Sequence, residues 1–239
     1  MGRIFVTGDT HGLLDFEKLK RFCTGGKLTR DDYIIIAGDA GIVWSKDSLE
    51  ESIKAYEDLG VTILFVDGNH ENYSMLEHCL NVTWWHGGRV HKISQNIYHL
   101  QRGEIYFING KSILTVGGGE STDKEYRVEN ETWWPQEKIA PKDWANAINK
   151  LQGNGDKVDY IITHIPPSSI LREIEKDLTQ CGEDIPYYIE PQLIDTESNK
   201  ILEMLKNRVV FEKWLFGHMH IDMNLGQFRC LYDDIIEVK

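Results

Sequence analysis

Short apolar runs alternate with polar and glycine-containing turns along the chain. Five of the runs have the composition of buried strands: 4–6, 33–36, 63–66, 160–162 and 214–216. Their β-branched and aromatic residues, bounded by turn residues, predict strands covered on both faces, as in a mainly parallel sheet. Between the first three runs, residues 13–22 and 49–59 have apolar positions at helical spacing with charges between them. The pattern predicts an α/β fold.

A polar motif follows each of these five runs, and most of the motifs begin with glycine. The motifs are Gly8-Asp9-Thr10-His11-Gly12, Gly38-Asp39, Gly68-Asn69-His70-Glu71, Thr163-His164-Ile165-Pro166 and Gly217-His218-Met219-His220. Five of the nine histidines fall within them. Open α/β sheets carry their ligand sites at the carboxyl ends of strands, and glycine lets the backbone turn sharply there. We therefore expect these motifs to meet at one site.

The first three motifs recur at a fixed spacing. Thirty positions separate Asp9 from Asp39, and thirty more separate Asp39 from Asn69. This spacing matches the roughly 30 residues of a strand, a crossover helix and a parallel strand, so we expect two successive units. Farther along, residues 112–116 predict another strand, and residues 228–238 predict a closing pair of strands.

The motifs supply carboxylate, amide and imidazole groups. Imidazole together with carboxylate suits Zn, Fe, Mn and related first-row ions, whereas a magnesium site usually carries more oxygen ligands and no histidine. The sequence therefore predicts a metal site. For each residue taken alone, the alternative is a turn residue, a helix N-cap or a hydrogen-bonded structural histidine.

Composition sets the outer limits. With 239 residues, of which 41% are hydrophobic and 27% charged, the chain suits one globular domain, residues 1–239. No apolar stretch approaches the roughly 20 residues of a membrane span, and we expect no signal or transit peptide. The cysteines Cys23, Cys79, Cys181 and Cys230 form no C-x-x-C pair, which favours reduced thiols and a cytoplasmic protein.

The formal net charge of −12 argues against sequence-independent binding to extended nucleic acid, which needs a basic surface. It does not exclude a phosphate ligand. Two divalent ions would outweigh the carboxylates of Asp9 and Asp39, so the site itself can stay electropositive. A small phosphoester or nucleotide is therefore compatible with this charge.

The order of the motifs, D-x-H, G-D, G-N-H-E, a lone histidine after a strand and then G-H-x-H, resembles the calcineurin-like metallophosphoesterase superfamily. The resemblance spans residues 3–220. It implies a four-layer α/β/β/α sandwich, in which two mixed β-sheets pack face to face and are flanked by helices. It also implies that the metals lie at one edge of the sandwich.

The resemblance further implies a role for each motif residue. One divalent ion is bound by Asp9, His11 and His220, the other by Asn69, His164 and His218, and Asp39 bridges them. The two ions, Mn, Fe or Zn, clamp the phosphoryl oxygens and lower the pKa of a shared water, so that a metal-bridging hydroxide attacks in line. His70 touches no metal; as the catalytic side chain it hydrogen-bonds the developing charge or protonates the leaving oxygen.

Departures from the family pattern bear on the substrate. The second motif continues as Gly38-Asp39-Ala40-Gly41-Ile42-Val43-Trp44, without the Asp and Arg found there in the phosphoprotein phosphatases. The G-H-x-H ending resembles the phosphodiesterases, whereas Glu71 is typical of the phosphatase side. Phosphomonoesters and phosphodiesters both stay open. The alternatives are a phosphoprotein phosphatase and an inactive metal-holding scaffold that binds a partner protein.

Two long connections remain. Residues 117–137 combine a glycine-rich exit from a strand with Lys124 and Arg127, which are candidates to bind substrate phosphate. The alternative is a structural ion pair on Arg127 and tryptophans packed on the core. Residues 166–199 contain a charged helical stretch and either shape the rim of the site or form a dimer contact; the sequence does not set the oligomeric state. The other histidines, His78, His86, His91 and His99, are interpreted as surface or packing residues.

Overall fold

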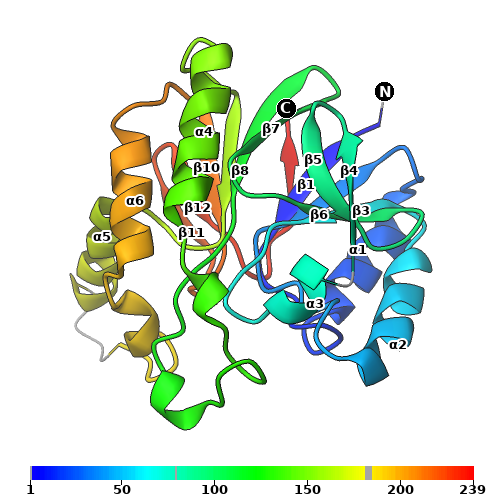
Figure 1. Ribbon diagram of the computed structural model, residues 1–239, viewed down its shortest axis with the longest axis horizontal. Helices are drawn as coiled ribbons and strands as arrows, with labels where there is room; N and C mark the ends of the chain where they lie inside the picture. Colours follow the sequence, from blue (N-terminus) through cyan, green and yellow to red (C-terminus); the bar gives the residue numbers. More distant parts are fainter. Residues whose placement is uncertain (1, 79, 181–184) are drawn as a thin grey trace.

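The computed structural model describes residues 2–78, 80–180 and 185–239, and within these ranges the chain forms two mixed β-sheets (Figure 1). In spatial order, the seven-stranded sheet is β13 (Ile236–Val238), β1 (Ile4–Thr7), β2 (Tyr33–Ile36), β3 (Thr62–Phe65), β6 (Ile97–Leu100), β5 (Gly88–Lys92) and β4 (Asn81–Trp85). The six-stranded sheet is β11 (Met223–Leu225), β12 (Phe228–Cys230), β10 (Lys213–Phe216), β9 (Tyr160–Thr163), β8 (Lys111–Val116) and β7 (Glu104–Ile108).

Helices cover the outer face of each sheet. They are α1 (Glu17–Gly26), α2 (Lys46–Glu57), α3 (Tyr73–His78), α4 (Pro141–Gly153), α5 (Ser168–Gln180) and α6 (Glu197–Lys206), with the 3-10 turns η1 (Lys124–Tyr126), η2 (Pro135–Glu137) and η3 (Glu190–Leu193). The first two helices lie on the seven-stranded sheet, and α4, α5 and α6 lie on the six-stranded sheet (Figure 1). The predicted four-layer α/β/β/α sandwich is confirmed.

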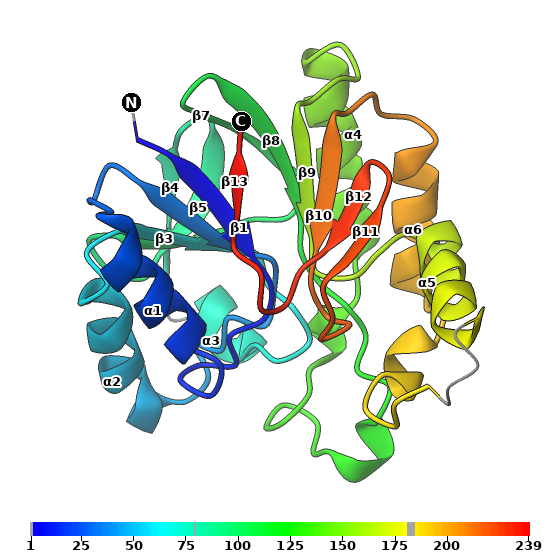
Figure 2. The same cartoon turned by 180° about the vertical axis from the view of Figure 1, so that it is seen from behind.

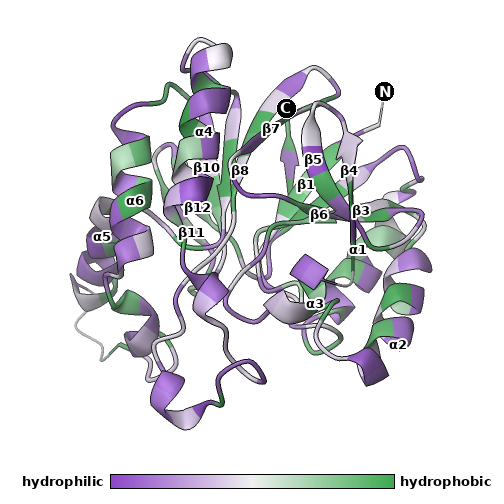
Figure 3. Cartoon of the chain, in the orientation of Figure 1, coloured by the Kyte–Doolittle hydropathy of each residue, from purple (hydrophilic) through white to green (hydrophobic). Residues whose placement is uncertain are grey.

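The two sheets share a central core. Val6 and Leu64 of one sheet pack with Ile162 and Leu215 of the other, and all four are almost completely buried. Separate apolar clusters join each sheet to its own helices. Hydrophobic positions follow the strands, and the outward sides of the helices are mostly hydrophilic (Figure 3). Strands covered on both faces explain the uninterrupted apolar runs in the sequence.

Parallel pairing brings the motif-bearing strands to a common edge. β1, β2 and β3 pair in parallel, with Ile4 beside Tyr33 and Tyr33 beside Thr62. In the second sheet, β8, β9 and β10 also pair in parallel. The chain leaves these strands of both sheets at the same end of the molecule (Figure 2). The two predicted strand-helix-strand units are present, and their carboxyl ends face those of the other sheet.

The first helix begins later than its apolar pattern predicts. The expected helix covers residues 13–22, but α1 starts at Glu17. Leu13 and Leu14 belong to the turn after the first motif, where their side chains are 39% and 85% exposed. These two leucines are therefore not part of the buried face of the helix.

Residues 228–238 form two strands, as predicted, but the prediction that these strands pair with each other is wrong. β12 pairs with β10 and β11 in one sheet, whereas β13 pairs antiparallel with β1 in the other. Between them, the Asp222 carboxylate accepts hydrogen bonds from the backbone N–H groups of Tyr232, Asp233 and Asp234. This turn redirects the chain, so its last residues join the two sheets instead of forming a hairpin.

Two of the four cysteines expected to be reduced, Cys79 and Cys181, lie outside the described residues. Cys23 and Cys230 are free thiols, and burial raises the pKa of Cys23 to about 11. Among the described helices, none is long and apolar enough to cross a lipid bilayer.

Candidate metal centre

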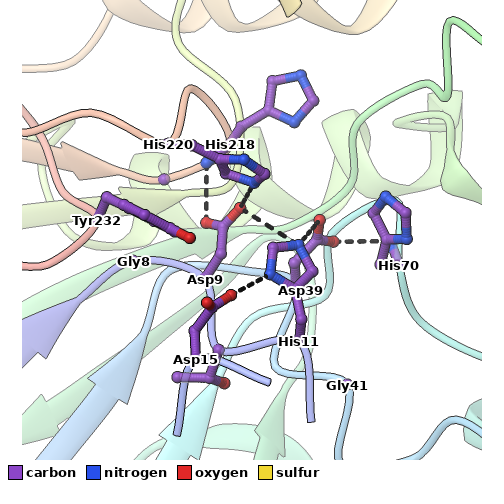
Figure 4. Close-up of polar contacts among 12 residues, drawn as sticks. Gly8, Asp9, His11, Asp15, Asp39, Gly41, His70, His218, His220 and Tyr232 are labelled. Carbon is purple, nitrogen blue, oxygen red and sulfur yellow. Dashed lines mark hydrogen bonds and ion pairs between the residues drawn. The ribbon is translucent and has the colours of Figure 1, made fainter. Parts of the chain in front are cut away.

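The side chains predicted from the five motifs converge where the carboxyl ends of the two sheets meet. Figure 4 labels those of Asp9, His11, Asp39, His70, His218 and His220. The loops after β1, β2 and β3 supply Asp9, His11, Asp39, Asn69 and His70, and the loops after β9 and β10 supply His164, His218 and His220. Among the residues that Figure 4 labels, Asp9 and Asp39 lie between the histidines. Residues more than 200 positions apart along the chain are thus neighbours here, as in the contact from His218 to Asp9.

Asp9, His11 and His220 form the first group of potential ligands. Their donor atoms all lie within 4.8 Å of one another. Nε2 of His220 is 3.2 Å from Oδ2 of Asp9, and Nε2 of His11 is 4.0 Å from the same oxygen. These distances leave the three donor atoms around a common point, which is the arrangement that a bound cation requires.

A second group surrounds His164. Its Nε2 lies 3.4 Å from Oδ1 of Asp39, 3.0 Å from Oδ1 of Asn69 and 3.2 Å from Nδ1 of His218. The other carboxylate oxygen of Asp39 is 3.5 Å from Nε2 of His11. Asp39 therefore lies between the two groups, with one oxygen toward each.

The chemistry of this donor set fits a divalent cation. Oδ2 of Asp9 is buried, and its polar neighbours among the described residues include the ring nitrogens of His220 and His11, with neither of which it makes a geometrically sound hydrogen bond. A buried carboxylate oxygen without a hydrogen bond costs about 1–3 kcal/mol or more, and a positive ion at that oxygen removes the penalty. Carboxylate, amide oxygen and imidazole are ligands suited to first-row divalent ions. The residues present can hold such ions.

The backbone at four of these residues adopts the left-handed conformation. The φ angles are +43° at His11, +48° at Asp39, +69° at His218 and +52° at His220. Few residues other than glycine occupy this region, although Asp and His do so more often than most. Such conformations concentrate at functional sites, where the surrounding structure maintains them. Here they turn each side chain out of its strand and toward the centre.

The glycines of the motifs make room for ligands from other motifs. A Cβ atom on Gly217 would overlap Oδ1 of Asp9, and one on Gly38 would overlap the ring of His164. The expectation that glycine permits close approach is supported, with one refinement. The space next to each of these glycines is filled by a side chain that arrives from a different strand.

Without metal, the carboxylates hold protons on two of the histidines. Burial works against the charged form of His11, but the hydrogen bond and field of Asp39 outweigh it and raise the pKa of His11 to about 10. Burial opposes the charged form of His164 as well, and Asp39 and Asp9 raise its pKa to about 9. Despite burial, His220 and His164 lower the pKa of Asp9 to about 2. The centre thus attracts positive charge.

His218 behaves differently from its neighbours. Burial, together with the field of His164, lowers the pKa of His218 to about 3. Its ring is therefore neutral at physiological pH and keeps a nitrogen lone pair available for coordination. The backbone N–H of His218 donates to Oδ1 of Asp9 at 2.9 Å, which fixes the loop against the first motif.

Two acceptors that the sequence interpretation missed orient the histidine rings. Nδ1 of His11 lies 2.7 Å from Oδ2 of Asp15, and Nδ1 of His164 lies 3.1 Å from the carbonyl oxygen of Ala37. In metal sites such partners fix the tautomer and turn the other ring nitrogen toward the ion. Asp15 follows His11 by four residues, and that spacing is the one local signal that indicates it.

A buried lysine also stabilises the loop that carries the first motif. Nζ of Lys18 donates to the carbonyl oxygen of Asp9 at 2.6 Å and to that of Tyr232. Burial lowers the pKa of Lys18. The ring of Tyr232 stacks on His220 with 4.9 Å between centroids. These contacts join α1 and the C-terminal turn to the metal centre, and no sequence motif predicts them.

Glu71 supports the second motif and does not reach the centre. Its Oε1 accepts hydrogen bonds from the backbone N–H groups of Ala40 at 2.8 Å and Gly41 at 3.2 Å. Complete burial, with the negative field of Asp39, raises its pKa well above the usual range of a glutamate. Through these two hydrogen bonds Glu71 fixes the loop that follows Asp39.

His70 stands at the edge of the centre. Its backbone N–H donates to Oδ1 of Asp39 at 2.7 Å, and its ring lies 5.4 Å from that of His11. Burial lowers the pKa of His70, although Asp39 opposes this effect. His70, His11 and Asp39 form a further group whose donor atoms lie within 4.8 Å of one another. The ring is thus close enough to act on anything bound there.

Of the two basic residues expected at the substrate loop, Arg127 reaches the centre. Its Nη2 lies 3.1 Å from Nε2 of His70, while its Nε pairs with Asp123 at 2.7 Å. Nζ of Lys124 lies 4.8 Å from the centre of the Trp133 ring. Trp134 is fully buried. The loop therefore approaches the centre, as expected of a substrate-binding loop. It also contains the ion pair on Arg127 and a packed tryptophan, which were expected of a purely structural loop.

The histidines outside the motifs include one buried pair. Nδ1 of His91 lies 2.9 Å from Nδ1 of His99, and Nε2 of His99 lies 3.0 Å from Oδ1 of Asp67. Asp67 also pairs with Arg102, and the field of Arg102 together with the hydrogen bond from His99 keeps the pKa of Asp67 well below the usual range despite burial. The pair packs in the core, as expected, but as part of a polar network. His78 and His86 are exposed or nearly so.

Comparison with known proteins agrees with this geometry. The family model described as calcineurin-like phosphoesterase matches residues 2–222. One solved structure covers 96% of this chain and 89% of its own, at 12% identity and a TM-score of 0.52, which is a likeness of fold. TT1561 of Thermus thermophilus has 11% identity, 99% and 98% coverage and a TM-score of 0.46. The protein of unknown function AQ665 from Aquifex aeolicus has 14% identity, 69% and 78% coverage and a TM-score of 0.37. No curated protein matches the chain significantly.

Proposed function

Because this chain belongs to the calcineurin-like phosphoesterase family, we propose that it is a dinuclear-metal phosphoesterase acting on small or nucleotide-like phosphomonoesters or phosphodiesters. One observation carries the proposal. Asp39 directs one carboxylate oxygen toward His11 and the other toward His164, each within 3.5 Å, between two groups of ligand-type atoms. A carboxylate in that position is suited to bridge two ions.

We assign the ligands as follows. Asp9, His11 and His220 hold one ion, Asn69, His164 and His218 hold the other, and Asp39 contacts both. The ligand types suit Mn, Fe or Zn. When bound, two such ions polarise phosphoryl oxygens and make water a better nucleophile at neutral pH. The free thiols of Cys23 and Cys230 support a cytoplasmic location.

The residues of the chain then orient the substrate and move a proton. Asp15 holds the ring of His11 so that Nε2 faces the two aspartates. In the structure Nε2 of His70 accepts from Arg127; once substrate replaces that contact, the same nitrogen donates a hydrogen bond to the phosphoryl group or a proton to the leaving oxygen. The guanidinium of Arg127, beside that nitrogen, is suited to bind a phosphoryl oxygen and fixes the side on which His70 meets the ester.

The experiment compares hydrolysis of p-nitrophenyl phosphate and bis-p-nitrophenyl phosphate by manganese-loaded and chelator-treated protein. We expect metal-dependent release of nitrophenol, and the ratio of the two rates reports the preference for monoester or diester. Inactivity on both substrates with two ions bound would contradict the enzyme proposal and favour the metal-holding scaffold. A phosphoprotein phosphatase is distinguished by activity on phosphoserine peptides alone.

Two variants separate the proposed roles. His70→Ala should keep both ions and lower turnover about 100-fold or more, because it removes the proton donor and not a ligand. Asp39→Ala should lose metal, since it removes the bridge. His86→Ala, at an exposed position away from the centre, is the control and should change neither. Equal metal loss in His70→Ala and Asp39→Ala would show that His70 is a ligand.

A further inference from the structure

A hollow of about 470 Å³ adjoins the candidate metal centre on the side of His11 and His70. Leu13, Leu14 and Trp44 supply its apolar lining. A single exposed leucine needs no explanation, but Leu14, at 85% exposure, lies next to two further apolar side chains at the mouth of a polar centre. The volume is in the range of a small-molecule site.

The ring of Trp44 forms a fixed wall of this hollow. Its centroid lies 5.7 Å from that of Trp134, which is buried, and 6.3 Å from that of His70. The carbonyl oxygen of Trp44 accepts a hydrogen bond of 2.7 Å from the side-chain amide of Asn72. An indole held on these contacts is a ready surface for a flat ring, because aromatic pairs gain about 0.5–1.5 kcal/mol beyond area burial.

The charges around the hollow argue against a second anionic group there. None of the described residues that line it is lysine or arginine, and Glu51 is exposed at its rim. Arg127 contacts His70 but does not line the hollow. A second phosphate placed there would meet no cationic side chain and one carboxylate. A neutral, apolar group is therefore favoured on this side.

We propose, on the premise of the phosphoesterase function, that this hollow binds the alcohol part of the substrate and selects phosphoesters whose alcohol carries a neutral aromatic ring. His11 and His70 belong to both the centre and the hollow, so a phosphoryl group bound at the centre directs one ester substituent between Leu14 and Trp44. The ring is either a simple aryl group or the base of a nucleoside.

Binding of phosphonates tests this inference without hydrolysis. We would titrate zinc-loaded protein with methylphosphonate, cyclohexylmethylphosphonate and benzylphosphonate by calorimetry. Benzylphosphonate should bind about tenfold more tightly than methylphosphonate, because it buries a ring. It should also bind more tightly than the cyclohexyl compound, because only a flat ring stacks on Trp44. A phosphonate analogue of a nucleoside monophosphate distinguishes a base from a simple aryl group.

Variants assign the preference to the hollow. Trp44→Ala and Leu14→Ser should reduce the affinity ratio of benzylphosphonate to methylphosphonate to near one, whereas Trp44→Phe, which retains an aromatic ring, should preserve most of it. Ile194→Ser, at a 52% exposed position away from the hollow, is the control and should leave the ratio unchanged. Thermal unfolding of each variant verifies folding.

Three results would overturn the inference. They are equal affinity for the methyl and benzyl compounds, equal affinity for the cyclohexyl and benzyl compounds, and a preference that persists in both Trp44→Ala and Leu14→Ser. In each case methylphosphonate still binds, so the proposed function is unaffected. Failure of every phosphonate to bind, together with absence of turnover, would instead contradict the proposed function itself.

Discussion

At the level of single residues, the candidate ligands depend on partners that hold their rings. His11 is oriented by the carboxylate of Asp15, whereas His164 is oriented by the carbonyl oxygen of Ala37. A carboxylate partner also makes an imidazole more basic, which strengthens its bond to a metal ion. Metal binding by His11 should therefore be more sensitive to the loss of its partner than metal binding by His164.

Asp15→Asn should weaken binding of a metal ion about 10- to 100-fold, because the neutral amide orients His11 poorly and no longer raises its basicity. Titration of metal-free protein with zinc by calorimetry measures the effect. Asp31→Asn, at an exposed aspartate outside the centre, is the matched control. Equal zinc affinity in Asp15→Asn and the wild type would show that the contact of Asp15 with His11 does not serve the metal.

Gly217→Ala should displace Asp9, because the added Cβ overlaps Oδ1 of that carboxylate. We expect a loss of stability of about 1–3 kcal/mol together with loss of bound metal. The control is Gly153→Ala, where a Cβ meets open space. Metal content and urea unfolding are measured on both variants. Normal metal content in Gly217→Ala would contradict the tight packing of ligands against the glycines.

The residues of the centre were predictable where the sequence carries a local signal. Asp9, His11 and His218 each follow a strand and stand next to a glycine, so pattern alone indicates them. Tyr232 carries no such signal, because its contact with His220 depends on a turn set by Asp222. Contacts of this kind depend on the tertiary fold, and sequence spacing does not reveal them.

At the level of secondary structure, the sequence predicted the motif-bearing strands better than the helix starts, and it did not predict β4, β5, β6, β7 and β11. The buried strands are short β-branched and aromatic runs with turn residues at both ends, so their bounds were predictable. The start of α1 was not predictable, because Leu13 and Leu14 fit the helical period yet line the hollow beside the centre. The pairing of the two closing strands was predicted wrongly, because the sheet that each strand joins depends on the turn at residues 232–234, which Asp222 fixes.

The pairing of β5 with β6 places His91 opposite His99, and this arrangement makes the stability of the fold depend on pH. Burial of His91, with the field of His99 added, lowers the pKa of His91 from 6.5 to about 4. The unfolded chain binds a proton near pH 6.5, and the folded protein does not until about pH 4. Stability from this source is therefore complete above pH 6.5 and is lost as the pH falls from 6.5 to 4.

Urea unfolding of metal-free protein between pH 7.5 and pH 4.5 measures this loss. His91→Gln, which does not titrate, should lose less stability over that interval than the wild type. His86→Gln, at an exposed histidine, should follow the wild type. An identical pH dependence in His91→Gln and the wild type would show that His91 does not contribute to acid sensitivity.

At the level of the whole molecule, the fold brings together groups that are far apart along the chain. The two sheets share one core, and after β12 in the second sheet the chain continues to β13, which pairs with β1 of the first. We propose that residues 1–239 form one domain, for which far- and near-ultraviolet dichroism should report a single coincident unfolding transition. The candidate metal centre lies where the sheets meet, so its potential ligands come from both.

On the proposed function, this arrangement explains how an acidic protein would bind a phosphoester. The net charge of −12 is spread over the chain, whereas the centre concentrates two carboxylates around the positions of the cations. With ions bound, the centre is positive, and Arg127 adds a positive group at its edge. The hollow beside His70 has a more apolar lining, and on our proposal it would receive the uncharged part of the substrate while the centre binds the charged part.

Anomalous diffraction from crystals of the manganese-loaded protein shows directly whether two ions bind at this centre. We expect two peaks on either side of Asp39, one among Asp9, His11 and His220 and the other among Asn69, His164 and His218. The absence of any peak at this centre, or a single peak with Asp39 uncoordinated, would contradict this expectation.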